Sequence, residues 1–354
     1  MSNFFSEKYK GLTPYTPGEQ PQDMQYVKLN TNESPFPPCE AVAKAAEGAA
    51  KKLQLYPDPD CKTLTRALAE RYDVAPENII LTNGSDEVLN FAFMAFCDAD
   101  HPITFPDISY GFYPVFAEIN RVPFQAIPLR EDFSIDPADY TNVGCNVVIA
   151  NPNAPTGLAL RAEQIEQIAV TNPDHVVIID EAYVDFGAES AVLLTKNYPN
   201  LLVTQTFSKS RSFAGGRLGF GIADKALIAD LNTVKYSTNP YNINRMTNEA
   251  ALAVLQNDDF YMQNCNIIQK NRAYLSDALQ GLGFTVLPSL SNFIFVKSDR
   301  IGGEALYLGL KKRGVLVRHF TAERIKDYNR ITIGSREQLD ILLREIKQLL
   351  EETI

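Results

Sequence analysis

Two stretches decide the fold: HVVIIDEAY at residues 175–183 and LLVTQTFSKSRSFAGGRLGF at residues 201–220. Each contains an apolar run without the alternation of a half-buried strand, and each run gives way to polar and charged residues. Strands that are apolar on both faces belong in a mostly parallel sheet covered by helices. Such sheets bind ligands beyond the carboxyl ends of their strands, so the polar residues after each run are expected to form a site.

The same alternation extends to both sides of these stretches. Between residues 78 and 222, the β-rich runs NIILT, NVVIA and GFGIA alternate with amphipathic segments such as SDEVLNFAFMAFC and LRAEQIEQIAV. This pattern predicts an α/β fold. Further helices are predicted over 39–53, 62–72 and 252–282.

The chain of 354 residues is long enough for two domains. Residues 1–35 are rich in Pro, Asn and Thr and are expected to form an extended arm. A large domain is expected over 36–255. From FIFVKS onward the pattern is strand, helix, strand, strand, helix, which predicts a smaller α/β domain over 256–354.

Composition excludes several classes of function. The net charge of −10 argues against nucleic acid or an anionic membrane as the partner. The N-terminus, MSNFFSEKYKG, lacks the features of a signal peptide, and no apolar run reaches the roughly 18 residues of a membrane helix. Three dispersed histidines and five scattered cysteines without a C-x-x-C pair indicate reduced thiols, a cytoplasmic location and no metal site.

Lys209 is the first candidate for chemistry. It follows an apolar strand and precedes a glycine-rich turn, where an amine that loses water becomes a nucleophile toward an aldehyde. Eight residues later, Arg217 offers a planar fork of donors for a phosphate. A lysine in a loop is more often a solvated surface residue, but the combination S-K and G-R-x-G at this spacing is rare by chance.

The other strand ends add polar groups. Asp180 ends the run VVII, either as a turn or capping residue or as a carboxylate under a pyridine nitrogen, and Tyr183 follows as a possible donor to a phenolate oxygen. Gly84 and Ser85 open a helix, either as a plain N-cap or as a phosphate cradle. Tyr110, in ISYGFY, is a candidate to stack on a ring, although aromatic residues more often belong to the core.

Together, NGSDE, ISYGFY, NPNAPTG, IIDEAY and TFSKSRSFAGGRLGF resemble the fold-type-I aminotransferases that use pyridoxal phosphate, and most of all the histidinol-phosphate aminotransferase family. The resemblance runs from LTPY and LNTNESPFP to NRITIGSREQ, over nearly the whole chain. It implies that Lys209 holds the cofactor as a Schiff base, that Asp180 pairs with the pyridinium and that Tyr183 donates to the phenolate oxygen. It also implies Tyr110 as the stacking residue, and a phosphate site made of Gly84, Ser85, Asp86, Thr206, Ser208 and Arg217.

One position departs from the family pattern. The family often reads N-P-N-N-P-T-G, and the asparagine before P-T-G contacts the phenolate oxygen, whereas this chain has Ala154 there. We expect the contact to be lost or to pass to Asn153.

The substrate end is expected to involve Tyr15, Arg318 and Arg330. Two arginines on adjacent strands could close over a phosphate or a carboxylate equally well, although a lone arginine is more often solvated or in a structural ion pair. The resemblance implies that they bind the phosphate of histidinol phosphate and the carboxylates of glutamate and 2-oxoglutarate, with assistance from Tyr15. It also implies a homodimer in which Tyr56, in LYPDPD, reaches the cofactor phosphate of the neighbouring chain.

Three alternatives stay open at this point. An aromatic amino-acid aminotransferase and a threonine-phosphate decarboxylase share the scaffold and its cofactor residues. A cofactor-binding regulator without turnover is a third, although no basic helix-turn-helix segment accompanies Lys209.

Overall fold

The computed structural model describes residues 2–352, which contain three sheets, of seven, four and two strands. The largest sheet has seven strands in the order β2-β8-β7-β6-β5-β3-β4. Strands β7 to β4 of that order run parallel, whereas β8 is antiparallel to both of its neighbours. The mostly parallel sheet predicted from the apolar runs is thereby confirmed. Its strands are β2 (Ile79–Thr82), β3 (Ile103–Pro106), β4 (Phe124–Ile127), β5 (Asn146–Ala150), β6 (Val177–Asp180), β7 (Leu201–Thr206) and β8 (Gly219–Ile222).

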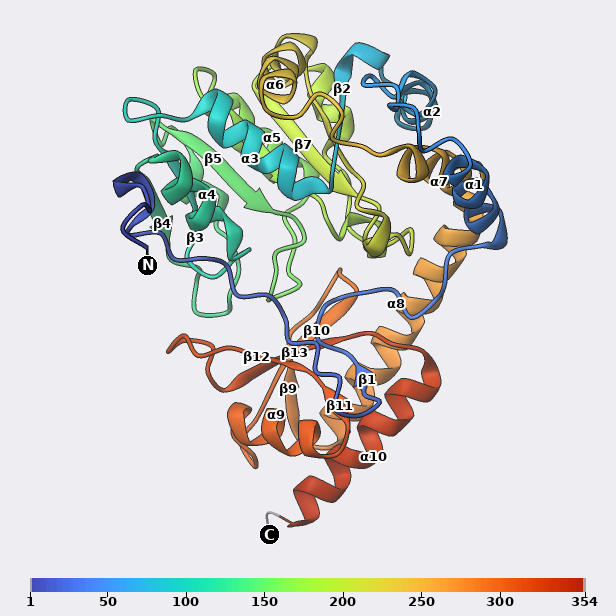
Figure 1. Cartoon of the computed structure of the whole chain (residues 1–354). Coiled ribbons are helices and arrows are strands. Elements are labelled where there is room, and N and C mark those ends of the chain that lie inside the picture. The colour runs from blue at the N-terminus through green and yellow to red at the C-terminus, as the bar shows by residue number, and fades with distance from the viewer. Residues whose placement is uncertain (1, 353–354) are drawn as a thin grey trace.

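Helices cover both faces of this sheet (Figure 1). Alternate strand residues point to opposite sides, so Ile149 and Ile179 pack with one group of helices while Val148 and Ile178 pack with the other. The first group contains α2 (Lys62–Tyr72), α5 (Ala162–Thr171) and α7 (Arg245–Gln256), with α1 (Glu40–Ala50) packed on α7. The second contains α3 (Ser85–Phe96), α4 (Phe112–Asn120) and α6 (Lys225–Thr238).

The C-terminal part has its own core and its own sheet, in the order β12-β13-β10-β9. In Figure 1 it lies below the large sheet, and the long helix α8 (Asp258–Gly281) runs between the two parts. Its elements are β9 (Phe284–Val286), β10 (Phe293–Ser298), α9 (Gly303–Lys312), β11 (Val315–Leu316), β12 (Arg318–His319), β13 (Tyr328–Thr332) and α10 (Arg336–Glu352).

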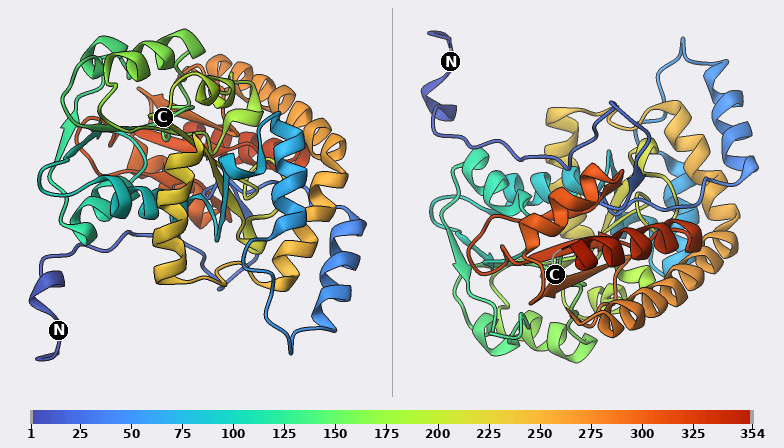
Figure 2. Two further views of the ribbon diagram at one scale, coloured as in Figure 1. Left: turned by 90° about the horizontal axis from the view of Figure 1, so that it is seen from above. Right: turned by 90° about the horizontal axis from the view of Figure 1, so that it is seen from below.

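The N-terminal arm follows an extended path. After a short 3-10 helix at Glu7–Tyr9, the arm crosses between the two parts of the molecule (Figures 1 and 2). It then adds the short strand β1 (Val27–Lys28) to β11 in parallel pairing. The arm therefore packs on the C-terminal part, and the domain boundaries at 35 and 255 remain predictions.

One helix prediction was wrong in detail. The single helix expected over 252–282 is two helices, α7 and α8, which meet at Asn257. The Asn257 side chain donates to the carbonyl oxygen of Ala253 at 2.8 Å, and Asp258 and Asp259 occupy the first turn of α8. A short polar side chain that bonds the local backbone competes with helix continuation, and acidic residues favour a helix start.

Candidate active site

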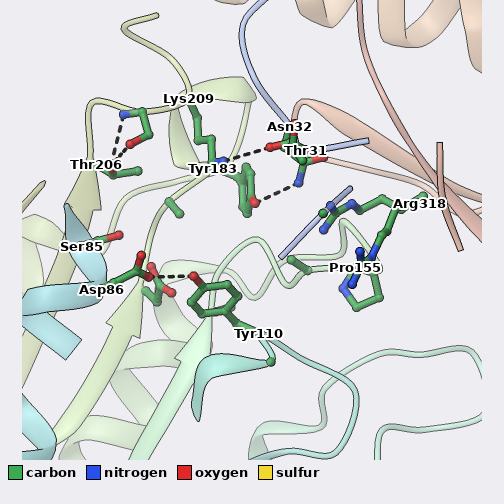
Figure 3. Close-up of a pocket in the computed structure, with 18 of the residues that line it drawn as sticks. Thr31, Asn32, Ser85, Asp86, Tyr110, Pro155, Tyr183, Thr206, Lys209 and Arg318 are labelled. Atoms are coloured by element: carbon green, nitrogen blue, oxygen red, sulfur yellow. Dashed lines mark hydrogen bonds between the residues drawn. The ribbon is translucent and has the colours of Figure 1, made fainter. Parts of the chain in front are cut away.

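A cavity of about 560 Å³ lies where the strand ends of the large sheet, the arm and the C-terminal part meet. Most of the predicted site residues line it, although they come from segments up to 315 residues apart in the chain. Those on the walls are Tyr15, Ser85, Asp86, Tyr110, Asp180, Tyr183, Thr206, Ser208, Lys209, Arg217, Arg318 and Arg330. Figure 3 shows ten labelled lining residues, with Lys209 and Tyr183 facing the arm residues Thr31 and Asn32.

Lys209 lies in the loop after β7. Its Nζ donates to the carbonyl oxygen of Thr31 at 3.3 Å and lies 5.9 Å from the centre of the Tyr183 ring. The next two residues fix this loop, because Ser210 Oγ and Arg211 Nη1 both donate to Asp185 Oδ2, at 2.5 and 2.8 Å. The lysine is therefore held at the cavity wall with one weak backbone contact.

Arg211 was not identified from the sequence. It is 1% exposed and forms ion pairs with Asp185 and with Asp258 at the start of α8. A buried arginine needs such partners, since an isolated buried charge is very costly. Arg211 thus ties the loop of Lys209 to the segment after Tyr183 and to the helix that leads to the C-terminal part.

Asp180 ends β6 and is buried at the bottom of the cavity. Its carboxylate accepts hydrogen bonds from Tyr113 Oη at 3.0 Å and Thr204 Oγ1 at 3.2 Å, both neutral groups. Burial raises the pKa of Asp180 to about 6, and no cationic side chain within residues 2–352 forms an ion pair with it. The carboxylate is therefore suited to a positively charged ring nitrogen. Tyr113, which the sequence analysis did not identify, contributes a hydrogen bond to this carboxylate.

Tyr183 follows at the same sheet edge. Its hydroxyl oxygen accepts from Asn32 Nδ2 at 3.0 Å (Figure 3). Asn32 Oδ1 in turn accepts from Thr332 Oγ1 at 3.0 Å. The Tyr183 ring packs edge-on against Phe293, with centroids 5.0 Å apart. Asn32 was missed because it lies 151 residues away in the arm, within LNTNESPFP, where only the family resemblance marks it.

The phosphate end is built around the start of α3. The structure makes Gly84 the N-cap, with φ of +85°, and Ser85 the first helical residue, so Ser85 is not the N-cap suggested by its chemistry. No side chain caps this helix, which leaves its N-terminus available to an anion. A Cβ on Gly84 would lie 2.5 Å from Arg217 Nη2, so glycine here lets the guanidinium approach.

The opposite wall of the phosphate end contains Ser208 and Thr206. Arg217 Nη1 donates to Ser208 Oγ at 3.3 Å, and Thr206 Oγ1 donates to the same oxygen at 3.0 Å. Across the cavity, Tyr110 Oη donates to Asp86 Oδ1 at 2.7 Å, while Asp86 Oδ2 lies 3.7 Å from Arg217 Nη2. Burial, followed by the neighbouring Asp86 carboxylate, raises the pKa of Tyr110 well above its usual value, so its hydroxyl stays protonated.

Asn153 does not take the place of the missing asparagine. Its side-chain amide donates to the Ile108 carbonyl at 2.9 Å and to Thr156 Oγ1 at 3.2 Å, and its oxygen accepts from Ser109 at 2.8 Å. All these side-chain groups are bound within the protein and Asn153 is 1% exposed, so its role is to hold neighbouring loop residues in place. Ala154 and Pro155 line the cavity in its place. Of the two expected outcomes, loss of the contact fits these bonds and its transfer to Asn153 does not.

The substrate end is formed by two arginines and the arm. Arg330 Nη2 donates to the carbonyl oxygen of Asn30 at 3.0 Å, and its buried Nε has no hydrogen-bond partner within residues 2–352. Burial lowers the pKa of Arg330. Arg318 donates to the carbonyl oxygens of Thr16 and Pro17, both at 3.4 Å. Two guanidinium groups with weak or missing partners are chemically suited to bind an anion at this end of the cavity.

Tyr56 is not among the residues that line this cavity in the single chain. Its side chain is 79% exposed and stacks on Tyr241, with centroids 4.8 Å apart. Arg245 Nη2 donates to the Tyr56 carbonyl oxygen at 2.6 Å, which holds the loop in place. An exposed aromatic pair on a fixed loop suits contact with another molecule, and the shared site stays a prediction.

Two further findings concern the described residues 2–352. They contain no cluster of three or more His, Cys, Asp or Glu residues that could hold a metal ion, and all five cysteines are free. None of their helices is both long and apolar enough to span a membrane.

Comparisons with known proteins agree with this geometry. Residues 24–346 match the family model "Aminotransferase class I and II". The chain is 48% identical to a histidinol-phosphate aminotransferase of Brachyspira hyodysenteriae, over 99% of this chain and all of that protein. It is 44% identical to one of Clostridium botulinum with the same coverage.

Solved structures give the same fold. The histidinol-phosphate aminotransferase of Sinorhizobium meliloti, solved with pyridoxal 5′-phosphate, has a TM-score of 0.90 at 22% identity and covers all of this chain and 99% of its own. An L-threonine-O-3-phosphate decarboxylase of Porphyromonas gingivalis has a TM-score of 0.81 at 23% identity, with coverage of 92% and 99%. The fold therefore does not separate these activities, whereas the full-length sequence identity does favour one of them. The chain belongs to the class I and II aminotransferases, which depend on pyridoxal phosphate, and within them to the histidinol-phosphate aminotransferase family.

Proposed function

We propose that the enzyme transfers the amino group of histidinol phosphate to 2-oxoglutarate, giving imidazole-acetol phosphate and glutamate in a reversible step of histidine biosynthesis. One observation carries this proposal: the cavity has a nucleophilic lysine and a buried carboxylate at one end and two under-bonded arginines at the other. The full-length identity of 48% to a histidinol-phosphate aminotransferase supports the choice of amino donor.

The cavity fits pyridoxal phosphate residue by residue. Arg217, Ser208, Thr206 and the N-terminus of α3 would hold its phosphate, and Tyr110 would lie against its ring. Asp180 would meet the ring nitrogen, because a buried carboxylate without a cation is stabilised by a positive partner. When bound, this cofactor supplies an aldehyde that accepts the amino group and a pyridinium ring that withdraws electrons from the reacting carbon.

Lys209 is assigned two roles. Its Nζ is the amine that would bind the cofactor's aldehyde at rest, and once displaced by a substrate amine it would carry a proton as general acid and base. The weak 3.3 Å contact to the Thr31 carbonyl and the nearby Tyr183 ring leave Nζ able to move. Tyr183 would direct its hydroxyl to the cofactor's phenolate oxygen. Asn32, which donates to that hydroxyl oxygen, would keep the tyrosine proton turned toward the cofactor.

Arg318 and Arg330 would bind the anionic group of each substrate in turn. The phosphate of histidinol phosphate and the carboxylates of glutamate both accept bidentate hydrogen bonds from guanidinium groups. Tyr15, which stacks on Phe112 at 4.1 Å, would close the cavity over the substrate from the arm side. A site that serves two anions needs donors that are not already paired, as the free Nε of Arg330 illustrates.

The active form is proposed to be a cytoplasmic homodimer with shared sites. Exposed Tyr56, together with Leu53 and Leu55, forms an apolar edge next to Tyr241. In a two-fold arrangement, each Tyr56 would reach the cofactor phosphate of the other chain reciprocally. The five free thiols suit a reducing compartment.

Mixing two inactive variants tests the shared site. Lys209→Ala and Tyr56→Ala chains, mixed under conditions of subunit exchange, should regain about one quarter of wild-type activity, because one site of each hybrid has both native residues. Each variant incubated alone is the control. Activity of Tyr56→Ala alone at the wild-type level, or no recovery in demonstrated hybrids, would contradict the proposal.

Product analysis tests the reaction itself. Purified enzyme with histidinol phosphate and 2-oxoglutarate should form glutamate and imidazole-acetol phosphate in equal amounts without release of carbon dioxide. Carbon dioxide release from threonine phosphate at a higher rate would instead identify a decarboxylase.

A further inference from the structure

The wall of the cavity formed by arm residues 15–18 is held at its two ends by different parts of the molecule. At one end, Tyr15 stacks on Phe112 of α4, and Thr13 N donates to Glu118 at 3.4 Å. At the other end, Glu19 contacts α9 of the C-terminal part. The arm therefore bridges both parts of the molecule across the substrate end of the cavity.

Glu19 makes the densest contacts of this segment. Its Oε1 accepts from Tyr307 Oη at 2.6 Å, its Oε2 forms an ion pair with Lys311, and its backbone oxygen accepts from Asn30 Nδ2 at 2.9 Å. Partial burial alone would raise the pKa of Glu19, but the hydrogen bonds from Lys311 and Tyr307 outweigh it and lower the pKa. Glu19 is therefore ionised at neutral pH, and it anchors the arm on α9.

The arm residues next to this anchor contact the substrate end. The carbonyl oxygens of Thr16 and Pro17 accept from Arg318. Gly18 lies so close to the next segment that a Cβ there would be 2.5 Å from Thr31 Cγ2. Arg330 donates to the carbonyl oxygen of Asn30, whose side chain in turn donates to the backbone oxygen of Glu19. A shift of residues 15–19 would thus move Tyr15 and Arg318 directly, and Arg330 only through Asn30.

We propose that Glu19 is a positioning residue for the substrate: through Tyr307 and Lys311 it fixes the arm so that Tyr15 and Arg318 meet the anionic substrate. The inference rests on the proposed function and extends it to a residue outside the cavity. Lys209 contacts the arm only at Thr31, beyond residues 15–19, and the neighbouring Ser210 holds its loop on Asp185. Asp180 is held by Tyr113. Loss of the anchor should therefore weaken substrate binding and spare the chemical step.

Steady-state kinetics on the cofactor-loaded enzyme test this role. Glu19→Ala should raise KM for histidinol phosphate about tenfold while kcat stays within about threefold, the pattern for lost binding. Glu19→Gln, which can still accept from Tyr307, should recover part of the loss. Lys311→Met should act in the same direction, and the Glu19→Ala, Lys311→Met double variant should be no worse than Glu19→Ala, because the two side chains act as one unit.

Asp73→Asn is the matched control. It removes an exposed ion pair with Lys196 at 2.6 Å, away from the cavity, and should leave KM unchanged. An unchanged KM in Glu19→Ala and Lys311→Met, or an additive double variant, would overturn the proposal.

A second readout does not require turnover. Chymotrypsin should cleave after Tyr15 faster in the resting Glu19→Ala enzyme than in wild type or Asp73→Asn, because the released arm exposes the ring now packed on Phe112. Equal cleavage rates would contradict the role of Glu19 as the anchor of the arm. If the wild-type enzyme failed to use histidinol phosphate, the proposed function would fail, and cleavage would still report on the arm.

Discussion

The two ends of the cavity are built differently. The floor, which is proposed to hold the cofactor and comprises Ser85, Tyr110, Asp180, Lys209 and Arg217, comes from the ends of strands in one sheet and the loops and helix that follow them. The rim, which is proposed to bind the substrate and comprises Tyr15, Arg318 and Arg330, comes from the arm and from two strands of the smaller sheet. In the floor, Tyr110 and Asp180 are held by side-chain hydrogen bonds of 2.7–3.2 Å. The rim arginines bind only backbone oxygens, at 3.0–3.4 Å.

This difference suggests that the floor governs catalysis and that the rim governs the choice of substrate. A floor fixed by side chains of one sheet presents the same groups to every substrate, which preorganisation requires. A rim with weakly bound donors can turn them toward either of two anions. The floor should therefore determine the rate with all amino donors, and the rim should determine which donors are used.

The largest effect is expected at Lys209. Lys209→Ala should lose at least about 10²–10⁴-fold of activity, the range of general acid–base catalysis, and the loss should be equal for histidinol phosphate and glutamate. It should also abolish trapping of the cofactor by borohydride. A reducible covalent adduct at another lysine would show that the floor has been assigned wrongly.

Asp180→Ala should have the next largest effect. The variant should retain some cofactor and lose most activity with every donor, since an unprotonated pyridine is a poor electron acceptor. Glu181→Gln, at the adjacent buried position, is the matched control and should keep its activity, because Glu181 does not line the cavity. Equal losses of activity in both variants would mean that the loss comes from a disturbed strand β6 and not from the missing carboxylate of Asp180.

Arg330→Ala tests the rim. Leaving a buried anion without this donor should cost about 2–5 kcal/mol in kcat/KM for both histidinol phosphate and glutamate. Arg318→Ala should cost less, because Arg318 is bound at longer distances and partly exposed. A loss confined to glutamate would weaken the histidinol-phosphate assignment, and unchanged kinetics with both substrates would remove Arg330 from the site.

The smallest effect concerns stability and pH. Burial raises the pKa of Glu181 to about 7, although Ala191 N, Ser190 and Gln205 donate hydrogen bonds to it. The folded state therefore binds this proton more tightly than the unfolded state, whose pKa lies near 4.5. The resulting stabilisation is complete below pH 4.5 and is lost as the pH rises through 7, by roughly 3 kcal/mol.

The midpoints of denaturant unfolding at pH 5.5 and 7.5 measure how much stability the protonation of Glu181 contributes. Wild type should lose stability between the two values, and Glu181→Gln, which cannot titrate, should lose less. An identical pH dependence in both proteins would show that Glu181 does not change its protonation in this range.

The sequence predicted the residues that line the cavity better than the residues that support them, for a physical reason. Asp180, Lys209 and Arg217 each stand beside the strand that positions them, so a local pattern marks both the strand and the residue. Tyr113 supports Asp180 from another helix, and Asn32 reaches Tyr183 from the arm, so no local pattern reveals either contact. The motif left open whether Asn153 takes over the contact, because a motif letter does not say which way a side chain points; in the structure it bonds Ile108, Ser109 and Thr156.

Relative use of amino donors tests the central claim most directly. With 2-oxoglutarate as acceptor, kcat/KM should be measured for histidinol phosphate, phenylalanine, tyrosine and threonine phosphate under one set of conditions. Two arginines proposed to bind a phosphate predict that histidinol phosphate exceeds phenylalanine and tyrosine by at least about 10²-fold, because neither amino acid brings a phosphate to these donors. Threonine phosphate, which has the phosphate but no imidazole ring, should be used less well than histidinol phosphate. An aromatic amino acid used as well as histidinol phosphate would contradict the account and identify a general aromatic aminotransferase.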